Sequence, residues 1–385
     1  MARSNFSASP VKIKVVGLGG GGSNAVTRMV RDGVAGVDFI AMNTDAQSLA
    51  IAEAPIRIQL GEKLVGGWGA GGDHHVGQKA AEETRDDIKE VVNGAEMVFI
   101  TAGMGGGTGT GSASVVADVA KQCGALTIAI VTKPFGFEGT HRMAVAEEGI
   151  KMLMPLVDTL IIIPNDRLFT LCDKKTGVDA AFKLADEVLA NGVQAIAQVI
   201  TVPGEINLDF ADVKTIMKGA GPAWMSIGKG SGENRAVDAA KSALSSPLLD
   251  VSVSGAKGVL FNVTGGDNLA LFEVNEAAEV IRQAVDPDAN IIFGVVRDNL
   301  MDKDIKITLI ATGFKSSPLS GNTVNEAEIN GYLKELKSEN EDQIDVPAFL
   351  RLAQLSQKRV PTPAFAPAPQ KQQALRSPFH NSWNR

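Results

Sequence analysis

The chain has 385 residues, of which 44% are hydrophobic and 21% are charged, and its formal net charge is -7. This composition is typical of a globular protein with two domains and tails, and the acidic balance argues against nucleic acid as the main partner. Cys123 and Cys172 are the only cysteines. They are too few for a disulfide framework, so we expect a reducing cytoplasm. We also expect neither a signal peptide nor direct membrane insertion, because residues 1–10 are polar and no apolar run reaches transmembrane length.

A first strand is predicted at residues 11–16, followed by a turn rich in glycine and a helix to about Asp32. Gly17, Gly19 and Gly22 satisfy the dinucleotide fingerprint G-x-G-x-x-G, which is weak when it stands alone. A second strand at residues 37–42 ends before Asp45. An acidic side chain at that position could bind a ribose or act nearer the phosphates.

A second glycine-rich loop covers residues 66–75, after a short strand at 56–60, and a long amphipathic helix is predicted at 76–92. The loop ends in Asp73-His74-His75, a combination that suggests a metal site. Two adjacent histidines on a loop offer two ligands at best, so we expect no metal ion to be held there.

The third glycine-rich loop, residues 103–111, lies between a buried strand predicted at 96–102 and a helix at 113–122. Strand, glycine loop and helix is the order that a phosphate-binding turn needs, because backbone N–H groups and the helix dipole converge on the anion. Thr108, Thr110 and Ser112 could add hydroxyl groups. The loop has no lysine and is not a Walker P-loop, so phosphate charge would be met by amides, a helix end and a metal ion.

Further strands are predicted at residues 126–131 and 158–164, with a helix from about 137 to 154 between them. Glu138 and Arg142 are spaced as an ordinary surface ion pair. These strand–loop–helix units predict a mainly parallel sheet, whose ligands bind beyond the carboxyl ends of the strands. Three glycine-rich loops at that edge indicate one nucleotide held from several sides.

A helix predicted at 178–202 is apolar almost all round, so we expect it to be buried between two domains. Phe182 and Asp186 lie one turn apart on it. Core packing and surface charge would explain them separately, and a base stacked on the ring and bound by the carboxylate would explain them together. Asp209 and Asp212 lie near the start of the next helix, where capping by Asn207 or Asp209 explains them from spacing alone.

The second half is predicted to be a smaller α/β domain, with strands at 224–228, 257–263, 290–297 and 305–312 and helices at 234–244 and 273–285. Residues 322–343 are acidic and polar, as in a linker. The short apolar segment 344–351 follows, inside a low-complexity tail. Nothing local can bury that segment, so we interpret it as a partner-docking motif.

Together these motifs resemble the FtsZ family, the bacterial tubulin-like GTPases of cell division. The resemblance runs from about residue 11 to 313 and returns at 344–351. It implies a tubulin-like α/β fold: a flexible N-terminus (1–10), a GTP-binding domain (11–175), a central helix (176–202), a C-terminal α/β domain with the catalytic loop (203–313), a linker (314–343), the docking motif (344–351) and a disordered tail (352–385). The motifs that carry it are residues 20–24, 43–47, 103–111, 137–142, 164–166 and 207–213.

The resemblance also implies roles for single residues. GTP or GDP would be bound, with Mg²⁺ held mainly through phosphates and water. Asp209, Asp212 and Asn207 would act on the nucleotide of the neighbouring subunit in a head-to-tail filament, which replaces the capping explanation. The implied GTP-binding residues are Gly20, Gly21, Gly22, Ser23, Asn24, Asp45, Ala70, Gly71, Gly103, Gly105, Gly106, Gly107, Thr108, Gly109, Thr110, Pro134, Glu138, Arg142, Asn165, Phe182 and Asp186.

The partners implied are other copies of the chain, in a ring at mid-cell beneath the membrane, and membrane-anchoring and regulatory division proteins. The latter would dock on residues 344–351 through Asp345, Pro347, Phe349 and Leu350. Two alternatives stay open: an NAD-dependent oxidoreductase, resting on the G-x-G-x-x-G pattern with Asp45, and a nucleotide-binding scaffold without hydrolysis. The presence of Asp209 and Asp212 argues against the scaffold.

Overall fold

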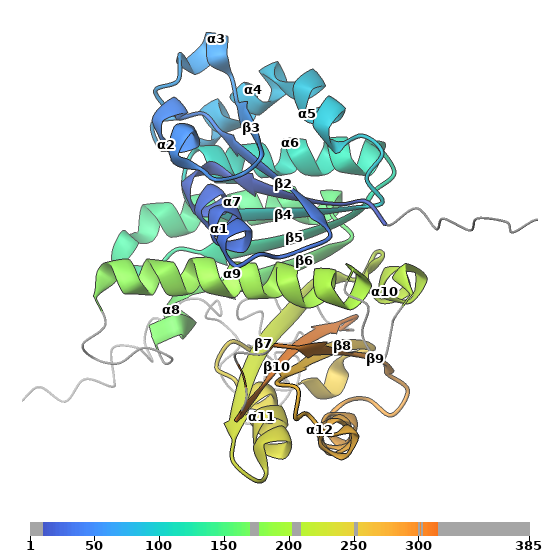
Figure 1. Ribbon diagram of the computed structural model, residues 1–385. Coiled ribbons are helices and arrows are strands. Elements are labelled where there is room, and N and C mark those ends of the chain that lie inside the picture. Colours follow the sequence, from blue (N-terminus) through green and yellow to red (C-terminus); the bar gives the residue numbers. More distant parts are fainter. Residues whose placement is uncertain are drawn as a thin grey trace, which may run out of the picture. The chain divides into compact units, whose positions relative to one another are not determined.

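The computed structural model describes residues 11–169, 177–201, 209–249, 253–298, 301 and 303–314. A 10-stranded sheet runs through this part of the chain in the order β3-β2-β1-β4-β5-β6-β7-β10-β8-β9 (Figure 1). The strands are β1 (Ile13–Leu18), β2 (Val37–Asn43), β3 (Ile56–Gln59), β4 (Met97–Gly103), β5 (Leu126–Lys133), β6 (Thr159–Pro164), β7 (Gly221–Ser231), β8 (Gly258–Gly265), β9 (Asn290–Arg297) and β10 (Asp304–Thr312).

The principal helices connect these strands and cover the sheet. They are α1 (Gly19–Arg31), α2 (Ala46–Ile51), α3 (Glu62–Val65), α4 (His74–Glu83), α5 (Arg85–Val92), α6 (Thr108–Gln122), α7 (Thr140–Leu153), α8 (Asn165–Leu168), α9 (Val178–Thr201), α10 (Phe210–Met217), α11 (Arg235–Leu244) and α12 (Leu271–Ala284).

The first six strands pair in parallel, as predicted, and their carboxyl ends meet at one edge of the sheet. Leu18 at the end of β1 pairs with Ala102, Gly103 at the end of β4 pairs with Thr132, and Lys133 at the end of β5 pairs with Pro164. β1, β4 and β5 are buried on both faces, which explains their nearly continuous apolar sequences. The loops that follow β1, β4, β5 and β6 therefore lie side by side.

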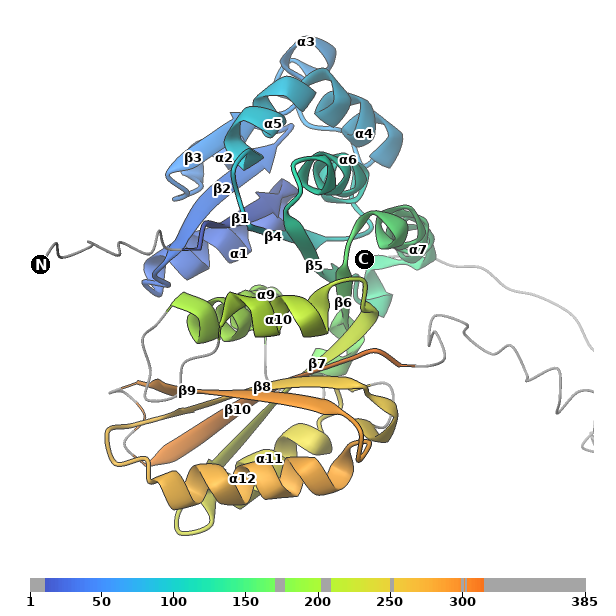
Figure 2. The same cartoon turned by 90° about the vertical axis from the view of Figure 1, so that its right-hand side faces the viewer.

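The second group of strands forms a mixed sheet and makes up the smaller domain. β7 continues the parallel sheet by pairing with β6, then pairs antiparallel with β10, which pairs antiparallel with β8. β9 is parallel to β8. α11 and α12 lie on one side of these strands and α9 lies on the other (Figure 2).

Helix α9 is buried, as its apolar sequence predicts. Val188, Leu189, Val193 and Ile196 are all at most 2% exposed. The helix packs against α1 and β5 of the first domain and against β8, β9 and β10 of the second. Its buried residues share one hydrophobic cluster with residues of both domains.

Two of the boundaries that differ from those predicted have a clear physical reason. The helix predicted at 76–92 is divided into α4 and α5 at Thr84, whose hydroxyl donates to Ala80 O and accepts from Gly61 N. This side chain competes for a helix carbonyl and ties the chain to the loop at Gly61. Helix α6 begins at Thr108 and not at Ala113, because the last residues of the glycine-rich loop are already helical. Glycine is required there because a side chain would not fit. A Cβ on Gly111 would lie 2.0 Å from His74 O.

Among the helices of the described ranges, none has the length and apolar character needed to cross a membrane. Several predictions concern residues outside those ranges: the N-terminus 1–10, Cys172, Asn207, residues 315–343 of the linker, the docking motif 344–351 and the tail 352–385.

Candidate functional site

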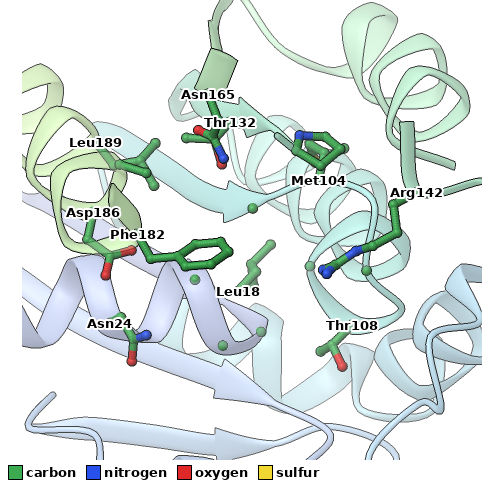
Figure 3. A pocket seen from close by; sticks show the side chains of 18 of the residues that line it. Leu18, Asn24, Met104, Thr108, Thr132, Arg142, Asn165, Phe182, Asp186 and Leu189 are labelled. Carbon is green, nitrogen blue, oxygen red and sulfur yellow. The ribbon is translucent and has the colours of Figure 1, made fainter. Parts of the chain in front are cut away.

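A cavity of about 400 Å³ opens at the carboxyl edge of the parallel strands. It is bounded by the starts of α1 and α6, by residues that follow β5 and β6, and by the N-terminal half of α9 (Figure 3). Its lining residues are Leu18, Gly19, Gly20, Gly21, Asn24, Gly103, Met104, Gly106, Gly107, Thr108, Gly109, Thr132, Pro134, Glu138, Arg142, Asn165, Phe182, Ala185, Asp186 and Leu189.

The G-x-G-x-x-G pattern of the first turn is explained by close backbone packing. A Cβ on Gly17 would lie 2.3 Å from Gly22 O, and a Cβ on Gly22 would lie 2.3 Å from Thr101 O. Only glycine allows α1 to begin directly against β1 and β4. Residues 19–22 form the first turn of α1, whose N–H groups have no partner within the helix and can bind an anion.

The start of α6 lies beside the start of α1. A Cβ on Gly19 would lie 2.9 Å from Gly109 N, and a Cβ on Gly109 would lie 2.9 Å from Gly103 O. Both helix N-termini therefore border the same cavity, and their dipoles add at this end. The arrangement favours a multiply charged anion such as an oligophosphate.

The hydroxyl groups of the third loop have different surroundings. Thr108 lines the cavity, and its Oγ1 lies 2.5 Å from Thr44 Oγ1. Thr110 accepts a hydrogen bond from Gly105 N, and Ser112 donates one to Thr108 O, so both hold the loop in shape. Of the three hydroxyls singled out from the sequence, the one at Thr108 borders the cavity.

Glu138 and Arg142 form the predicted ion pair, but on the wall of the cavity and not on an open surface. The distance from Arg142 Nη1 to Glu138 Oε2 is 2.7 Å, and the glutamate side chain is 7% exposed against 50% for the arginine. Glu138 Oε1 also accepts from Phe135 N at 2.8 Å. The carboxylate is thereby fixed, and the guanidinium faces the cavity beside the third loop (Figure 3).

An aromatic side chain lies at the other end of the cavity. Phe182 is 39% exposed and meets the buried Phe135 edge to face, with ring centroids 5.4 Å apart and an interplanar angle of 89°. Figure 3 shows the ring reaching into the cavity from α9. A fixed ring that is open on the cavity side is suited to stacking against a planar base.

Two polar groups lie at the same end. Asp186 follows Phe182 by one helical turn, and burial raises the pKa of its carboxyl group to about 7, against an opposing effect of Arg28. Asn165 is 5% exposed, and its Oδ1 is buried without a hydrogen-bond partner among the described residues. A buried acceptor without a donor is costly. A ligand with N–H groups, such as a purine, would satisfy both side chains.

Seven residues implied by the resemblance do not line the cavity. Gly22 packs against β4, and Ser23 Oγ is buried without a hydrogen-bond partner in the described chain. Asp45 caps α2, accepting from Gln47 N at 2.9 Å and Ser48 Oγ at 2.6 Å, and the bond from Ser48 lowers the pKa of its carboxyl group. Ligand roles for these residues stay predictions; the set is Gly22, Ser23, Asp45, Ala70, Gly71, Gly105 and Thr110.

Asp209 and Asp212 are exposed and lie outside the cavity of their own chain. Asp209 is at the N-cap position of α10, but its side chain makes no capping hydrogen bond, so capping does not account for its carboxylate. α10 lies near the C-terminal end of α9, whereas Asp186 is on the N-terminal half (Figure 1). The helix alone rises about 22 Å between Asp186 and Thr201.

Several residues that line the cavity were given no binding role from the sequence. Leu18, Met104 and Thr132 lie at or next to the ends of strands, at the edge of the sheet where ligands bind. Their position at strand ends could have identified them from the sequence. Ala185 and Leu189 lie on the face of α9 that also carries Phe182 and Asp186, so helical spacing could have identified them.

Comparisons with known proteins agree with this geometry. The profile of the Tubulin/FtsZ family, GTPase domain, matches residues 12–173, and that of the FtsZ family, C-terminal domain, matches residues 221–315. An empty FtsZ dimer from M. jannaschii has 45% sequence identity over 80% of this chain and 89% of that chain, with a TM-score of 0.78. A point variant of M. jannaschii FtsZ has 45% identity over 80% and 92%, with a TM-score of 0.77.

A more distant structure supports the fold alone. CetZ2 from Haloferax volcanii, a GTPγS-bound protofilament, has 19% identity over 85% of this chain and 99% of that chain, with a TM-score of 0.68.

Proposed function

The chain belongs to the FtsZ family of tubulin-like GTPases, and from this premise we propose that it hydrolyses GTP in filaments that it forms with other copies of itself. Membership of this family argues against the alternative function, that of an NAD-dependent oxidoreductase. The observation that carries the proposal is the cavity, in which two helix N-termini border one end and Phe182 with Asp186 border the other. Such a site fits a nucleoside triphosphate lying along its length.

The base end supports guanine as the base. Guanine presents adjacent N1–H and N2–H groups, and an ionised Asp186 can accept a hydrogen bond from each. Phe182 would stack on the ring, and the buried Asn165 Oδ1 would gain the donor that it lacks in the described chain. Adenine has no such pair of donors, so the proposed site selects GTP over ATP.

The phosphate end supports binding by backbone amides. Among the described residues that line the cavity, Arg142 is the cation, and it is half exposed. The first turns of α1 and α6 would bind the phosphates. The residues present fit a Mg²⁺ ion that would be held mainly by phosphate oxygens and water, and the hydroxyl group of Thr108 on the cavity wall could contribute a side-chain oxygen. Mg²⁺, when bound, supplies neutralisation of phosphate charge.

Hydrolysis is proposed to require the neighbouring subunit. Asp209 and Asp212 are exposed on α10, away from their own cavity, and could enter the cavity of the next subunit in a head-to-tail contact. There the two carboxylates would orient and polarise the attacking water. The dimer of M. jannaschii FtsZ among the similar structures supports self-association. Asn207, outside the described residues, is proposed to join them.

We also propose the cellular role of the FtsZ family, a cytoplasmic ring at the future division site. Residues 344–351 would dock membrane-anchoring and regulatory division proteins, with Asp345, Pro347, Phe349 and Leu350 as the contacts. This role rests on the family and on an apolar segment in a polar tail. Crosslinking a photoreactive group at Phe349 in cells tests it, and labelling of no division protein would contradict it.

The decisive test of shared catalysis mixes two inactive variants. Asp212→Asn retains an intact cavity, and Asp186→Ala retains intact α10 carboxylates. Each alone is expected to lose about a hundredfold or more of GTP turnover. Their mixture should recover part of that turnover, because the Asp186→Ala subunit supplies Asp212 to the intact cavity of its neighbour. Phosphate release measured above and below the assembly threshold, with light scattering, reports both steps.

Asp238→Asn, an exposed aspartate on α11, is the matched control and should keep full turnover. No recovery in the mixture, although scattering shows that the two variants co-assemble, would mean that each chain hydrolyses its own GTP. GTP affinity that falls in Asp212→Asn would instead place this residue in its own chain's binding site.

A further inference from the structure

Three side chains that could bind a metal ion meet beside the third glycine loop, although the sequence suggested two at most. His74 and His75 begin α4, and Glu148 comes from α7, more than seventy residues later in the chain. One potential ligand atom from each lies within 4.8 Å of the others. The distance from His74 Nε2 to Glu148 Oε1 is 3.5 Å.

His74 has the features of a ligand more than of a core residue. The residue is 7% exposed, yet its Nε2 is buried and makes no hydrogen bond to the described chain. A buried imidazole nitrogen aimed at a carboxylate without a hydrogen bond is left unsatisfied, which is unfavourable. An ion between the two groups would satisfy both.

The backbone on both sides of the cluster is held in place. A Cβ on Gly111 would lie 2.0 Å from His74 O, so α4 packs directly on α6 at this point. A Cβ on Gly149, next to Glu148, would lie 2.2 Å from Thr110 Cγ2, so α7 also packs closely against the start of α6. The ligands therefore come from two helices fixed on a common support, while the exposed His75 and Glu148 side chains can adjust.

The geometry points to a site for a divalent transition-metal ion of the Zn²⁺ class, held by His74, His75 and Glu148. Two imidazoles and one carboxylate are a ligand set typical of Zn²⁺, with a fourth position for water. Tetrahedral ligands at Zn–N distances of 2.0–2.1 Å lie about 3.4 Å apart. The spacing of His74 Nε2 and Glu148 Oε1 already matches, so His75 makes the remaining adjustment. This site is separate from the proposed Mg²⁺–phosphate contacts.

Charge near the cluster also suits a cation. The carboxylate of Asp73 lies at the start of α4, where it accepts a hydrogen bond from His75 N at 2.8 Å. With Glu148 it offsets the positive end of the α4 dipole.

The test is titration of the metal-free, full-length protein with ZnCl₂ by calorimetry, with Co²⁺ as a spectroscopic probe of the ligands. We expect one equivalent to bind, with visible Co²⁺ absorption typical of tetrahedral coordination. His75→Ala and Glu148→Gln change exposed side chains and should fold normally, and each should weaken Zn²⁺ binding at least about tenfold. Zn²⁺ should raise the melting temperature of the unsubstituted protein more than that of either variant.

His141→Ala and Glu147→Gln are matched controls, because both are exposed residues of α7 outside the cluster. Binding that is retained in these controls and lost in His75→Ala and Glu148→Gln supports the site. Absence of stoichiometric binding, or affinity that is equal in all four variants, would overturn it. The second result would place the bound ion on another surface or on the C-terminal segment that contains His380.

Discussion

The two ends of the cavity are built in different ways. The proposed phosphate end consists of backbone, from turns where an added Cβ would meet carbonyl oxygens or amides, as at Gly19 and Gly109. The proposed base end consists of side chains, Phe182, Asp186 and Asn165, which come from α9 and the start of α8. All nucleotides present the same phosphate groups to a protein, whereas the base distinguishes one nucleotide from another.

Because of this difference, we expect the backbone end to determine the affinity for all nucleotides and the side-chain end to determine the selectivity among bases. A change at the backbone end is expected to weaken every nucleotide, because all carry the same phosphates. A change at the side-chain end is expected to alter the preference among bases while the fold stays intact. The following predictions test that contrast, from the largest expected effect to the smallest.

Gly109→Ala should have the largest effect. The added methyl group would lie 2.9 Å from Gly103 O and 3.2 Å from Leu18 O, and neither is a flexible side chain. The start of α6 must then shift away from α1, at a cost of about 1–3 kcal/mol in stability. We expect nucleotide affinity to fall more than about a hundredfold for GTP and GDP alike, because several amide contacts move together. Equilibrium binding of a fluorescent GTP analogue, with circular dichroism to verify folding, measures both changes.

Asp186→Asn should weaken GTP about a hundredfold, because the amide cannot accept from two N–H groups. Affinity for XTP should rise, since xanthine has a carbonyl group where guanine has the N2 amine. Competition with the fluorescent analogue measures the two affinities. Equal losses for GTP and XTP would show that Asp186 holds the pocket in shape and does not read the base.

The same carboxylate predicts a pH dependence. Its pKa of about 7 in the free protein means that the group is mostly ionised at pH 8 and mostly protonated at pH 6. The ionised form accepts the guanine N–H groups, so GTP affinity should be about tenfold weaker at pH 6 than at pH 8. Asp186→Asn should flatten this profile. A wild-type profile that is flat over this range would contradict the proposed contact.

Phe182→Ala should weaken GTP about tenfold, because loss of a stacking ring costs about 1–3 kcal/mol per base. The ring is 39% exposed, so the melting temperature should change little. Phe182→Tyr keeps the aromatic face and should bind nearly as the wild type does. Because stacking does not depend on the base, GTP and XTP should weaken by similar factors in calorimetric titrations.

Gly20→Ala should have the smallest effect on affinity and the opposite effect on stability from Gly109→Ala. A Cβ on Gly20 would meet nothing within 4 Å, and the residue lies in the first turn of α1 on the cavity wall. Alanine favours the helix by up to about 1 kcal/mol. The melting temperature should therefore stay equal or rise, while GTP affinity falls a few-fold from crowding. An unchanged affinity would mean that the phosphates do not approach this turn.

Much of the fold could be predicted from the sequence because it depends on local patterns. Strand β9 begins and ends at the predicted residues, 290 and 297, and α9 is buried as its apolar residues indicate. The glycine turns were also identified correctly, because a position where two backbones approach closely requires glycine, and glycine is visible in the sequence. The break at Thr84 was not predicted, because it depends on a hydrogen bond to Gly61 that lies far off in the chain.

For this protein the motifs of the sequence carried the resemblance to the tubulin-like class, and the sequence by itself also determined the order of strands and helices and the glycine turns at the ligand-binding edge. The reason is that hydrophobic period and the lack of a Cβ act on each segment separately. The tertiary structure decided which side chains meet: Asn165 with Phe182 at one end of the cavity, Asp45 away from it, and Glu148 beside His74. These contacts depend on how the helices pack on the sheet, and that packing cannot be derived from the spacing of residues in the sequence.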